Sequence, residues 1–322
     1  MVFVNFHVVT GGGDGGAWAM LFLSAVEGKA AATFVVLAGV GLALGAQRNQ
    51  TPSFSILTLK RALFLFVIGL INSLIFPADI LHYYAVYFVV GLLLIRRSTR
   101  TILIVALVLP LVFVALLFVL DYEAGWDWET FDYAGFWTPS GFARNLLFNG
   151  WHPLVPWMSF LLMGFLLARL ELGRKKTQNR LMLYGAVALG AAYALSFVLS
   201  SDPELAELVT VSPIPPGPLY MLAGAGAASL SIGICLWVFR KGQVNWLTPF
   251  TRTGKQALSL YILHIIVGMG TLEGLGMLGG QSAETAIATA GLFIIISVIY
   301  AIVWARFFRS GPFEWLMHKL VR

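Results

Sequence analysis

Residues 101–120 read TILIVALVLPLVFVALLFVL and contain no charged side chain. A helix needs about 20 mostly apolar residues to cross the hydrocarbon core of a bilayer, so this stretch is long enough to span a membrane. Arg96, Arg97 and Arg100 precede it, and Asp121 follows it directly. Because Lys and Arg accumulate at the cytoplasmic ends of membrane helices, the stretch is predicted to run outward from the cytoplasm.

The same alternation of charge continues along the whole chain. All but Lys29 and Arg144 of the 21 Lys and Arg residues fall at every second junction between apolar runs, and most of the 15 acidic residues fall at the junctions between. We therefore predict that both termini are cytoplasmic. The basic groups occupy residues 48–61, 96–100, 169–180, 240–255 and 306–322.

The apolar runs predict an all-α protein. Backbone groups inside lipid must bond within their own segment, so runs of this length are helices rather than strands. A shorter run, 1–10, reads as the outer half of a first helix, and we expect that the chain natively begins further upstream. The fold class is thus a polytopic helical bundle of about ten membrane segments, the first abbreviated, in a single domain over 1–322. Runs of spanning length are 29–47, 61–77, 79–95, 101–120, 153–170, 181–200, 217–239, 255–272 and 285–305.

Composition excludes an ordinary soluble domain. Hydrophobic residues make up 59% of the chain and charged residues 11%, against about 25% charged in typical soluble domains, and the mean hydropathy is +0.84. The pI of about 9.5 does not indicate a nucleic-acid partner, because the basic residues form small groups beside the spans, where they contact anionic lipid. Membrane lipids are the expected partners, and a homodimer is a candidate assembly.

Four histidines are the main candidates for chemistry, because ionisable groups inside membrane helices are costly and often functional. His7, His82 and His152 are predicted at one depth near the outer face, and His264 near the middle of the membrane. The alternative is that each is a hydrogen-bonded packing residue. No two share the spacing that places two ligands on one helix face, so no metal site is predicted.

Aromatic and acidic residues surround the predicted outer site. Tyr83, Tyr84 and Tyr87 are placed to line a sugar or acyl site, or to belong to an interfacial aromatic belt. The outer loop 121–150 is a candidate lid or acceptor-binding surface, with the belt and a solvated acidic face as the alternative. Glu27 is a further candidate; it and Lys29 also read as a solvated pair.

Several strings resemble a known family of transmembrane acyltransferases, the heparan-alpha-glucosaminide N-acetyltransferases. They are MVFVNFH at 1–7, ILHYYAVYF at 80–88 and GKQALSLYILH at 254–264. Two others, NGWHPLVPW at 149–157 and GPFEWL at 311–316, are similar to its YeiB-like bacterial branch. The resemblance extends over nearly the whole chain.

The resemblance implies transfer of an acyl group, expected to be acetyl, from cytoplasmic acyl-CoA to a hydroxyl or amine of a carbohydrate or envelope metabolite on the far side. It implies a multi-pass protein of the bacterial cytoplasmic (inner) membrane. Acyl-CoA is the expected donor substrate, and no metal is expected. Basic groups would bind the CoA phosphates: Arg96, Arg97, Arg100, Arg252 and Lys255. The expected acceptor-binding residues are Asn5, His82, Tyr83, Tyr84, Tyr87, Trp151 and His152.

One departure from the family concerns the catalytic base. The animal enzymes carry a catalytic histidine in the outer connection between the first two core helices, but residues 11–28 contain none. His7 is the nearest histidine on the predicted outer side and is the expected base, with His264 as another candidate. A transporter or flippase for a lipid or small metabolite is the alternative function, and a non-enzymatic scaffold or sensor is the third.

Overall fold

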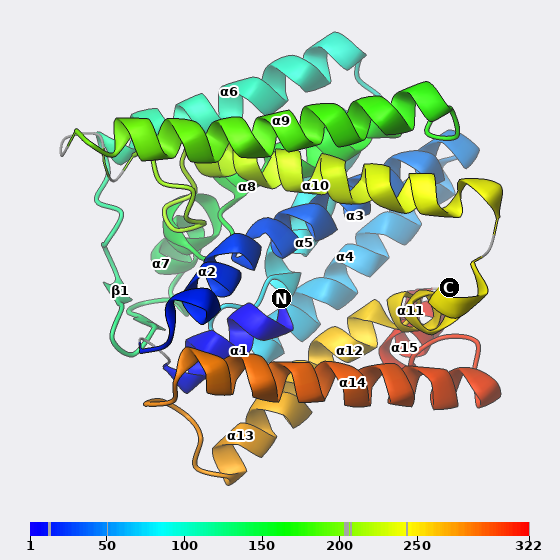
Figure 1. The fold of residues 1–322 in the computed structure, drawn as a ribbon. Coiled ribbons are helices and arrows are strands. Elements are labelled where there is room, and N and C mark those ends of the chain that lie inside the picture. The colour runs from blue at the N-terminus through cyan, green and yellow to red at the C-terminus, as the bar shows by residue number, and fades with distance from the viewer. Residues whose placement is uncertain (12–13, 50, 203–205, 207, 243, 322) are drawn as a thin grey trace. The chain divides into compact units, whose positions relative to one another are not determined.

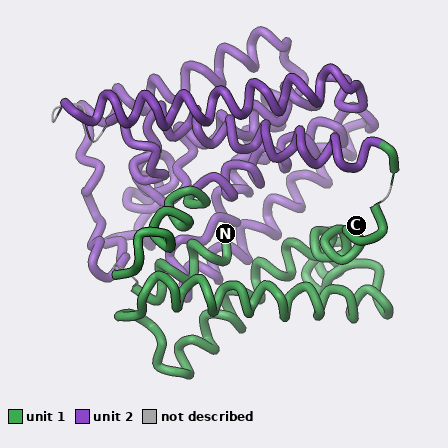
Figure 2. Tube along the Cα trace, in the orientation of Figure 1, with its two compact units in different colours: residues 1–27, 241–322 green, residues 28–240 purple. Residues whose placement is uncertain are grey.

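The computed structural model describes residues 1–11, 14–49, 51–202, 206, 208–242 and 244–321 (Figure 1). The chain divides into two compact units (Figure 2). Unit 1 comprises Met1–Glu27 and Lys241–Arg322, and unit 2 comprises Gly28–Arg240. The first unit is therefore assembled from the two ends of the sequence.

Helices make up 73% of the structure, which confirms the all-α fold class. The described part of unit 2 contains α3 (Lys29–Arg48), α4 (Pro52–Asn72), α5 (Leu81–Leu94), α6 (Thr99–Leu117), α7 (Pro139–Arg144), the π-helix η1 (Asn145–Asn149), α8 (Leu154–Leu167), α9 (Lys175–Leu199) and α10 (Pro218–Val238). A short antiparallel hairpin joins β1 (Trp126–Asp127) to β2 (Asp132–Tyr133).

The described part of unit 1 begins with α1 (Val2–Thr10) and α2 (Ala17–Val26). Its remaining elements are the 3-10 helix η3 (Asn245–Leu247), α11 (Thr248–Gly254), α12 (Ala257–Leu263), the π-helix η4 (His264–Met269), α13 (Gly270–Gly274), α14 (Ala283–Phe307) and α15 (Pro312–Val321). Another 3-10 turn, η2 (Phe239–Lys241), follows α10 where the chain passes from unit 2 to unit 1.

Seven helical segments among the described residues are long and apolar enough to cross a membrane, rather than the ten predicted. The count reaches eight if Pro139–Asn149 and Leu154–Leu167, which meet at a bend of 53°, form one broken span. Helix α5 has 14 residues and α1 has nine, so each is shorter than the bilayer core requires. Every predicted run nevertheless contains a helix, and the chain is a polytopic membrane protein.

Helix α3 lies against α8 at unusually close range because glycines face each other at the crossing. A Cβ added to Gly39 would lie 2.2 Å from the carbonyl oxygen of Leu161, and one added to Gly164 would lie 2.2 Å from that of Val36. Small residues allow backbones to approach in this way within membrane bundles. In Figure 1, α9 and α10 also run side by side.

In unit 1, α1 packs on α14 and η4. The ring of Phe6 lies 5.6 Å from that of Phe293, and a Cβ on Gly268 would lie 2.8 Å from the Phe6 ring. The C-terminal helix α15 supplies Glu314, whose Oε1 accepts hydrogen bonds from the backbone N–H groups of Leu258 at 2.8 Å and Ser259 at 3.1 Å. This carboxylate caps the beginning of α12, which leads to His264.

Candidate functional site

A buried polar cluster occupies the N-terminal end of α5 in unit 2. Asp79 is fully buried and His82 is 1% exposed. The Asp79 carboxylate accepts from the Leu81 backbone N–H at 2.7 Å and from the Asn72 side-chain amide at 3.2 Å. Its Oδ2 lies 3.5 Å from Nδ1 of His82, which also lies 3.4 Å from Oγ of Ser73. The cluster thus aligns several polar groups around one imidazole.

The predicted acceptor-site residues Tyr83, Tyr87 and His152 lie beside this cluster. The Tyr83 ring is 4.0 Å from the His82 ring and 5.7 Å from the His152 ring. The Tyr87 hydroxyl donates to the backbone oxygen of His152 at 2.6 Å, and Tyr84 packs against Tyr87 with ring centroids 5.9 Å apart. The structure therefore places His82 and His152 near the same tyrosine, Tyr83 of α5.

The loop 121–150 is a folded cap held by Asn149, which is fully buried. Its side-chain amide donates to the carbonyl oxygens of Tyr122 at 2.8 Å and Ala124 at 2.9 Å. Its side-chain oxygen accepts from the Tyr133 hydroxyl at 2.8 Å, and its backbone oxygen accepts from the Trp126 indole at 2.6 Å. These hydrogen bonds join both ends of the β1–β2 hairpin to η1.

Local structure shifts the pKa of two ionisable groups in this loop, the Asp127 carboxyl and the Tyr122 hydroxyl. Hydrogen bonds from the backbone N–H groups of Glu129 and Thr130 hold the pKa of the Asp127 carboxyl below its ordinary value. Burial raises the pKa of the Tyr122 hydroxyl above its ordinary value, because a desolvated phenolate is unfavourable. Asp127 is therefore charged and Tyr122 neutral at physiological pH.

A cavity of about 120 Å³ lies between this cap and the residues that precede α5. Its wall combines aromatic faces with hydrogen-bonding groups, and the indole of Trp137 is 61% exposed. Trp151, predicted to bind the acceptor, packs edge-on against Trp126 at 5.8 Å. Such a lining suits a ligand that has both a flat apolar face and polar substituents. The cavity is lined by Ser73, Pro77, Trp126, Asp132, Tyr133, Phe136, Trp137 and Asn145.

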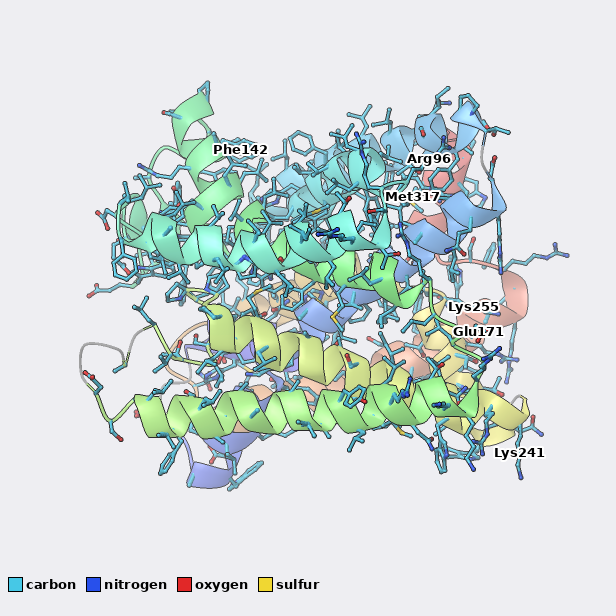
Figure 3. The ribbon with its side chains drawn as sticks, turned by 90° about the horizontal axis from the view of Figure 1, so that it is seen from above. Arg96, Phe142, Glu171, Lys241, Lys255 and Met317 are labelled. Carbon is cyan, nitrogen blue, oxygen red and sulfur yellow. The ribbon has the colours of Figure 1, made fainter. Side chains whose placement is uncertain are left out.

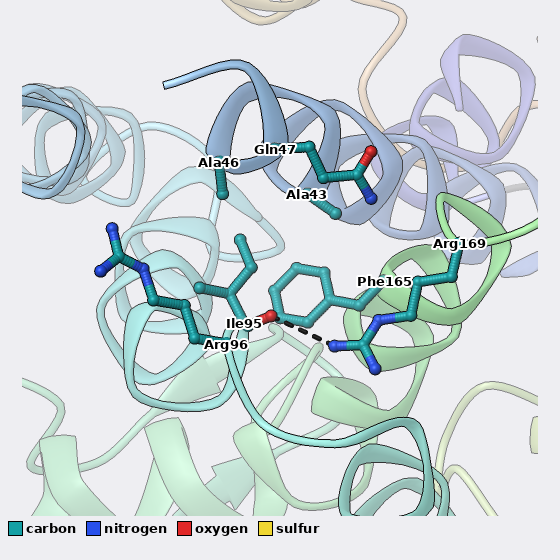
Figure 4. A pocket seen from close by; sticks show the side chains of 7 residues that line it. All are labelled: Ala43, Ala46, Gln47, Ile95, Arg96, Phe165 and Arg169. Atoms are coloured by element: carbon teal, nitrogen blue, oxygen red, sulfur yellow. Dashed lines mark hydrogen bonds between the residues drawn. The ribbon is translucent and has the colours of Figure 1, made fainter. Parts of the chain in front are cut away.

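A larger cavity, of about 360 Å³, opens at the C-terminal end of α5 (Figure 4). Figure 4 shows Arg96 and Arg169 on opposite sides of the Phe165 ring. The Arg169 guanidinium donates to the backbone oxygens of Ile95 at 3.3 Å and Arg97 at 2.7 Å, so its position is fixed at the helix end. The cavity is lined by Ala43, Ala46, Gln47, Ile95, Arg96, Phe165 and Arg169.

The two cavities lie toward opposite ends of unit 2. Helix α5 is about 21 Å long at 1.5 Å per residue, with the His82 cluster at its beginning and Arg96 just after its end. In Figure 3, Phe142, whose ring is 6.2 Å from that of His82, and Arg96 likewise lie toward opposite ends of the helices. Helix α8 contributes buried side chains to the interior of unit 2, including Trp157, Leu161 and Phe165.

Unit 1 holds the other predicted histidines. His264, 1% exposed, begins η4, and its Nδ1 contacts the carbonyl oxygen of Tyr261. Because a carbonyl only accepts, Nδ1 carries the hydrogen, and Nε2 accepts from the Asn5 side-chain amide at 2.8 Å. The half-buried His7 has a buried Nδ1 without a hydrogen-bond partner among the described residues.

The other predicted residues are divided between the units. Arg97 and Arg100 are exposed in unit 2, whereas Arg252 and Lys255 lie at the end of α11 in unit 1. Glu27 is half-buried directly after α2. Within the described residues, no group of three or more His, Cys, Asp or Glu side chains is arranged to hold a metal ion.

The interpretation of Lys29 as a solvated residue is wrong. Lys29 is 6% exposed, and its ammonium lies 5.5 Å from the centre of the Tyr193 ring and donates to the backbone oxygen of Val211 at 3.4 Å. An aromatic face and a carbonyl stabilise the cation after it leaves water.

Several residues that build these sites are not evident as site residues from the sequence. The spacing of Asp79 and His82 could have indicated their contact, because residues three positions apart can meet near the start of a helix. Asn149 begins the string NGWHPLVPW, but the hydrogen-bond partners of its side chain and of the Asn145 side chain lie 16 or more residues away in sequence, so the sequence did not indicate their roles. Arg169 was assigned only to a basic group on the cytoplasmic side.

Fold and site together define a polytopic membrane protein with one basic cavity and one aromatic cavity at opposite ends of a helical unit. Residues 3–198 match the family described as "Heparan-alpha-glucosaminide N-acetyltransferase, catalytic". Residues 156–322 match the family described as "Protein of unknown function (DUF418)". The chain therefore belongs to the heparan-alpha-glucosaminide N-acetyltransferase/DUF418 family, which confirms the resemblance seen in its motifs.

The chain is also similar to the uncharacterized protein YxaH of Bacillus subtilis (strain 168). The two are 24% identical over 331 residues, which cover 90% of this chain and 78% of YxaH. No solved structure matches the chain. The family match indicates a transmembrane acetyltransferase-like function.

Proposed function

We propose that this protein transfers an acyl group, acetyl in the first instance, from cytoplasmic acyl-CoA to a hydroxyl or amine of a carbohydrate or envelope metabolite on the outer side of a bacterial cytoplasmic membrane. The observation that carries the proposal is the match of residues 3–198 to an acetyltransferase catalytic family. The two cavities of unit 2 support it, because they offer different chemistry at opposite ends of α5.

The basic cavity is the proposed donor site. Arginine binds phosphate through paired, charge-assisted hydrogen bonds, and Arg96 and Arg169 both line this cavity. Arg97 lies between α5 and α6 and Arg100 in the first turn of α6, so both add positive charge close to Arg96 in sequence. Arg252 and Lys255 also remain proposed to bind CoA phosphates.

The aromatic cavity is the proposed acceptor site, and a histidine is the proposed base. Attack on the thioester carbon requires a proton to leave the acceptor hydroxyl or amine, and a neutral imidazole accepts it. The new C–O or C–N bond forms as the C–S bond breaks, and the CoA thiolate takes up a proton. His7 keeps the proposed base role, because Nε2 of His264 is already bound to Asn5.

An assay of the purified full-length chain tests this function. Acetyl-CoA labelled in the acetyl group is mixed with glucosamine, and labelled product and free CoA are measured. Arg96→Gln should raise the KM for acetyl-CoA by about 10- to 100-fold, the effect of losing a hydrogen bond from a charged donor. His7→Ala should lower kcat by about 100-fold or more.

Arg180→Gln is the matched control for the donor site. Arg180 is an exposed arginine of α9 and does not line the basic cavity, so its removal should leave KM unchanged. The proposal fails if no labelled product depends on acetyl-CoA. The proposed donor site is wrong if Arg96→Gln and Arg180→Gln have the same KM for acetyl-CoA. The proposed base is wrong if His7→Ala has the kcat of the original protein.

A further inference from the structure

Four aromatic residues line the aromatic cavity, and their rings follow one another at nearly right angles. Ring centroids lie 4.9 Å apart for Trp126 and Tyr133, 6.5 Å for Tyr133 and Phe136, and 5.0 Å for Phe136 and Trp137. The interplanar angles, in the same order, are 85°, 83° and 86°. The rings therefore form a turning wall rather than a flat stack, and a group in the cavity meets aromatic carbon from more than one direction.

Protein contacts hold this aromatic wall in place. The Trp126 indole N–H donates to the Asn149 backbone oxygen at 2.6 Å, and the Trp126 ring stacks on Trp128 with centroids 4.5 Å apart. The Tyr133 hydroxyl accepts from Nε of Arg144 at 2.6 Å and donates to the Asn149 side chain at 2.8 Å. The wall thus needs little ordering when a ligand binds, which favours affinity.

Most polar side chains that line the cavity already have partners. Asn145 Oδ1 accepts from the Tyr83 hydroxyl at 2.6 Å, and the Ser73 hydroxyl donates to the Gly69 backbone oxygen at 2.9 Å. Asp132 differs, because its hydrogen bonds to other described residues are made by its backbone. Its carboxylate is the charged lining group left to meet a ligand.

The charge around the cavity is negative. Residues 121–150 contain five Asp or Glu residues and a single basic residue, Arg144. The Arg144 guanidinium lies 5.3 Å from the centre of the Tyr133 ring and is not part of the cavity lining, whereas Asp132 is. A cation is therefore favoured over an anion. Aromatic faces, those of Trp most strongly, attract cations as well.

The size and the lining restrict which cation fits. The volume of about 120 Å³ is well below the roughly 300–1,000 Å³ of pockets for drug-sized molecules, so the cavity suits a small ligand or the head of a larger one. A primary ammonium brings three N–H donors, more than the Asp132 carboxylate satisfies alone. A quaternary ammonium has no N–H and surrounds its charge with methyl groups, which pack against aromatic rings.

We propose that the aromatic cavity binds a small quaternary ammonium head, with Trp126, Phe136 and Trp137 against its methyl groups and Asp132 near its charge. Free choline and the headgroup of phosphatidylcholine both carry this chemistry. The inference rests on the proposed function only in taking the ligand to be the acyl acceptor, whose reacting group is then a hydroxyl carried beside the ammonium.

Binding measured without acyl-CoA tests the proposal. Choline is titrated into the full-length protein in phosphatidylglycerol nanodiscs, with empty nanodiscs as the blank, and calorimetry gives the Kd. The carbon analogue of choline, in which a tert-butyl group replaces the trimethylammonium, has the same shape without the charge. It should bind about 5-fold or more weakly than choline, because it loses the attraction to the rings and to Asp132.

Two exposed lining residues, Trp137 and Asp132, separate the ring contribution from the charge contribution. Trp137→Leu should weaken choline binding by about 5- to 30-fold, whereas Trp137→Phe retains an aromatic face and should bind within about threefold of the original protein. Asp132→Asn should weaken binding by about 2- to 5-fold, and by less at high salt.

Matched controls change residues of the same kind that do not line the cavity. Glu129→Gln alters an exposed acid of the same hairpin, and Trp246→Leu alters an exposed tryptophan of unit 1; both should bind choline like the original protein. The proposal is overturned if choline binds no better than its carbon analogue. It is also overturned if Trp137→Leu or Asp132→Asn binds like its control, or if Trp137→Phe is as defective as Trp137→Leu.

A further arm identifies the source of the ammonium head. In nanodiscs that contain phosphatidylcholine, a headgroup site is already occupied and added choline should bind more weakly, whereas a site for free choline should be unaffected. Choline binding without acetyl transfer leaves this inference standing and refutes only the proposed function. Acetyl transfer to glucosamine by a protein that binds no quaternary ammonium overturns this inference alone.

Discussion

At the scale of single residues, hydrogen-bond partners give the histidines different properties. His264 has both ring nitrogens engaged, by Tyr261 and Asn5, whereas His82 presents a buried nitrogen without a partner among the described residues. The sequence identified both residues as candidates because polar groups are rare in membrane helices. It could not assign their states, since Asn5 and His264 are 259 positions apart and only the folded chain brings them together.

Asn149 provides a test of the cap at this scale. Asn149→Ala removes two side-chain donors and one side-chain acceptor from a fully buried position, leaving carbonyl oxygens and a hydroxyl unsatisfied. We expect the free energy of local opening of residues 121–150 to fall by about 2–5 kcal/mol. Hydrogen exchange followed by mass spectrometry measures it. Asn179→Ala, at an exposed position of α9, should leave exchange in this loop unchanged; equal exchange in both variants would mean that Asn149 does not hold the cap.

At the scale of elements, length decided which helices could be predicted. The long apolar runs became α3, α4, α6, α9, α10 and α14. Helix α2 was missed within the outer connection 11–28, because its ten residues extend only about 15 Å, half of a bilayer core. The bend between the helices on either side of residues 150–153 was also missed. An apolar run indicates that a segment lies in lipid, but it does not indicate whether the helix axis changes direction.

Glycine positions within α3 test how its contact with α8 forms. Gly39→Ala places a Cβ against the Leu161 backbone oxygen, which cannot rotate away, and should lower the free energy of unfolding by about 1–3 kcal/mol. Gly41→Ala is the matched control, because its Cβ would meet nothing within 4 Å and alanine favours a helix. Thermal unfolding of both purified variants measures the difference. A Gly39→Ala protein as stable as Gly41→Ala would show that the backbones of the two helices do not approach so closely.

At the scale of the whole molecule, composition was sufficient to predict the fold class, and the order of the motifs was sufficient to predict the family. Neither was sufficient to predict the site. Charge alternation predicted where the arginines gather, and Arg96 does line a cavity. The aromatic cavity could not be predicted, because its wall combines the end of α4, the hairpin and η1. The division into two units also has no counterpart in the sequence, where apolar runs follow one another evenly.

The bent helix pair Pro139–Asn149 and Leu154–Leu167 bears on the alternative function. A bend of 53° between two apolar helices, whether they form one broken span or a re-entrant loop, is compatible with a transporter, in which interrupted helices surround the substrate. An acyltransferase and a transporter differ in what reaches the far side. The first delivers an acylated product and releases CoA on the donor side, whereas the second delivers the substrate unchanged.

Proteoliposomes distinguish these outcomes most directly. Glucosamine is enclosed in vesicles that contain the full-length protein, and labelled acetyl-CoA is added outside only. We predict acetylated glucosamine inside the vesicles in step with free CoA outside, and neither from protein-free vesicles. Arg96→Gln vesicles should require more acetyl-CoA to reach the same rate. Labelled product that forms only when both substrates share one compartment, or glucosamine that leaves the vesicles unmodified, would contradict acyl transfer across the membrane.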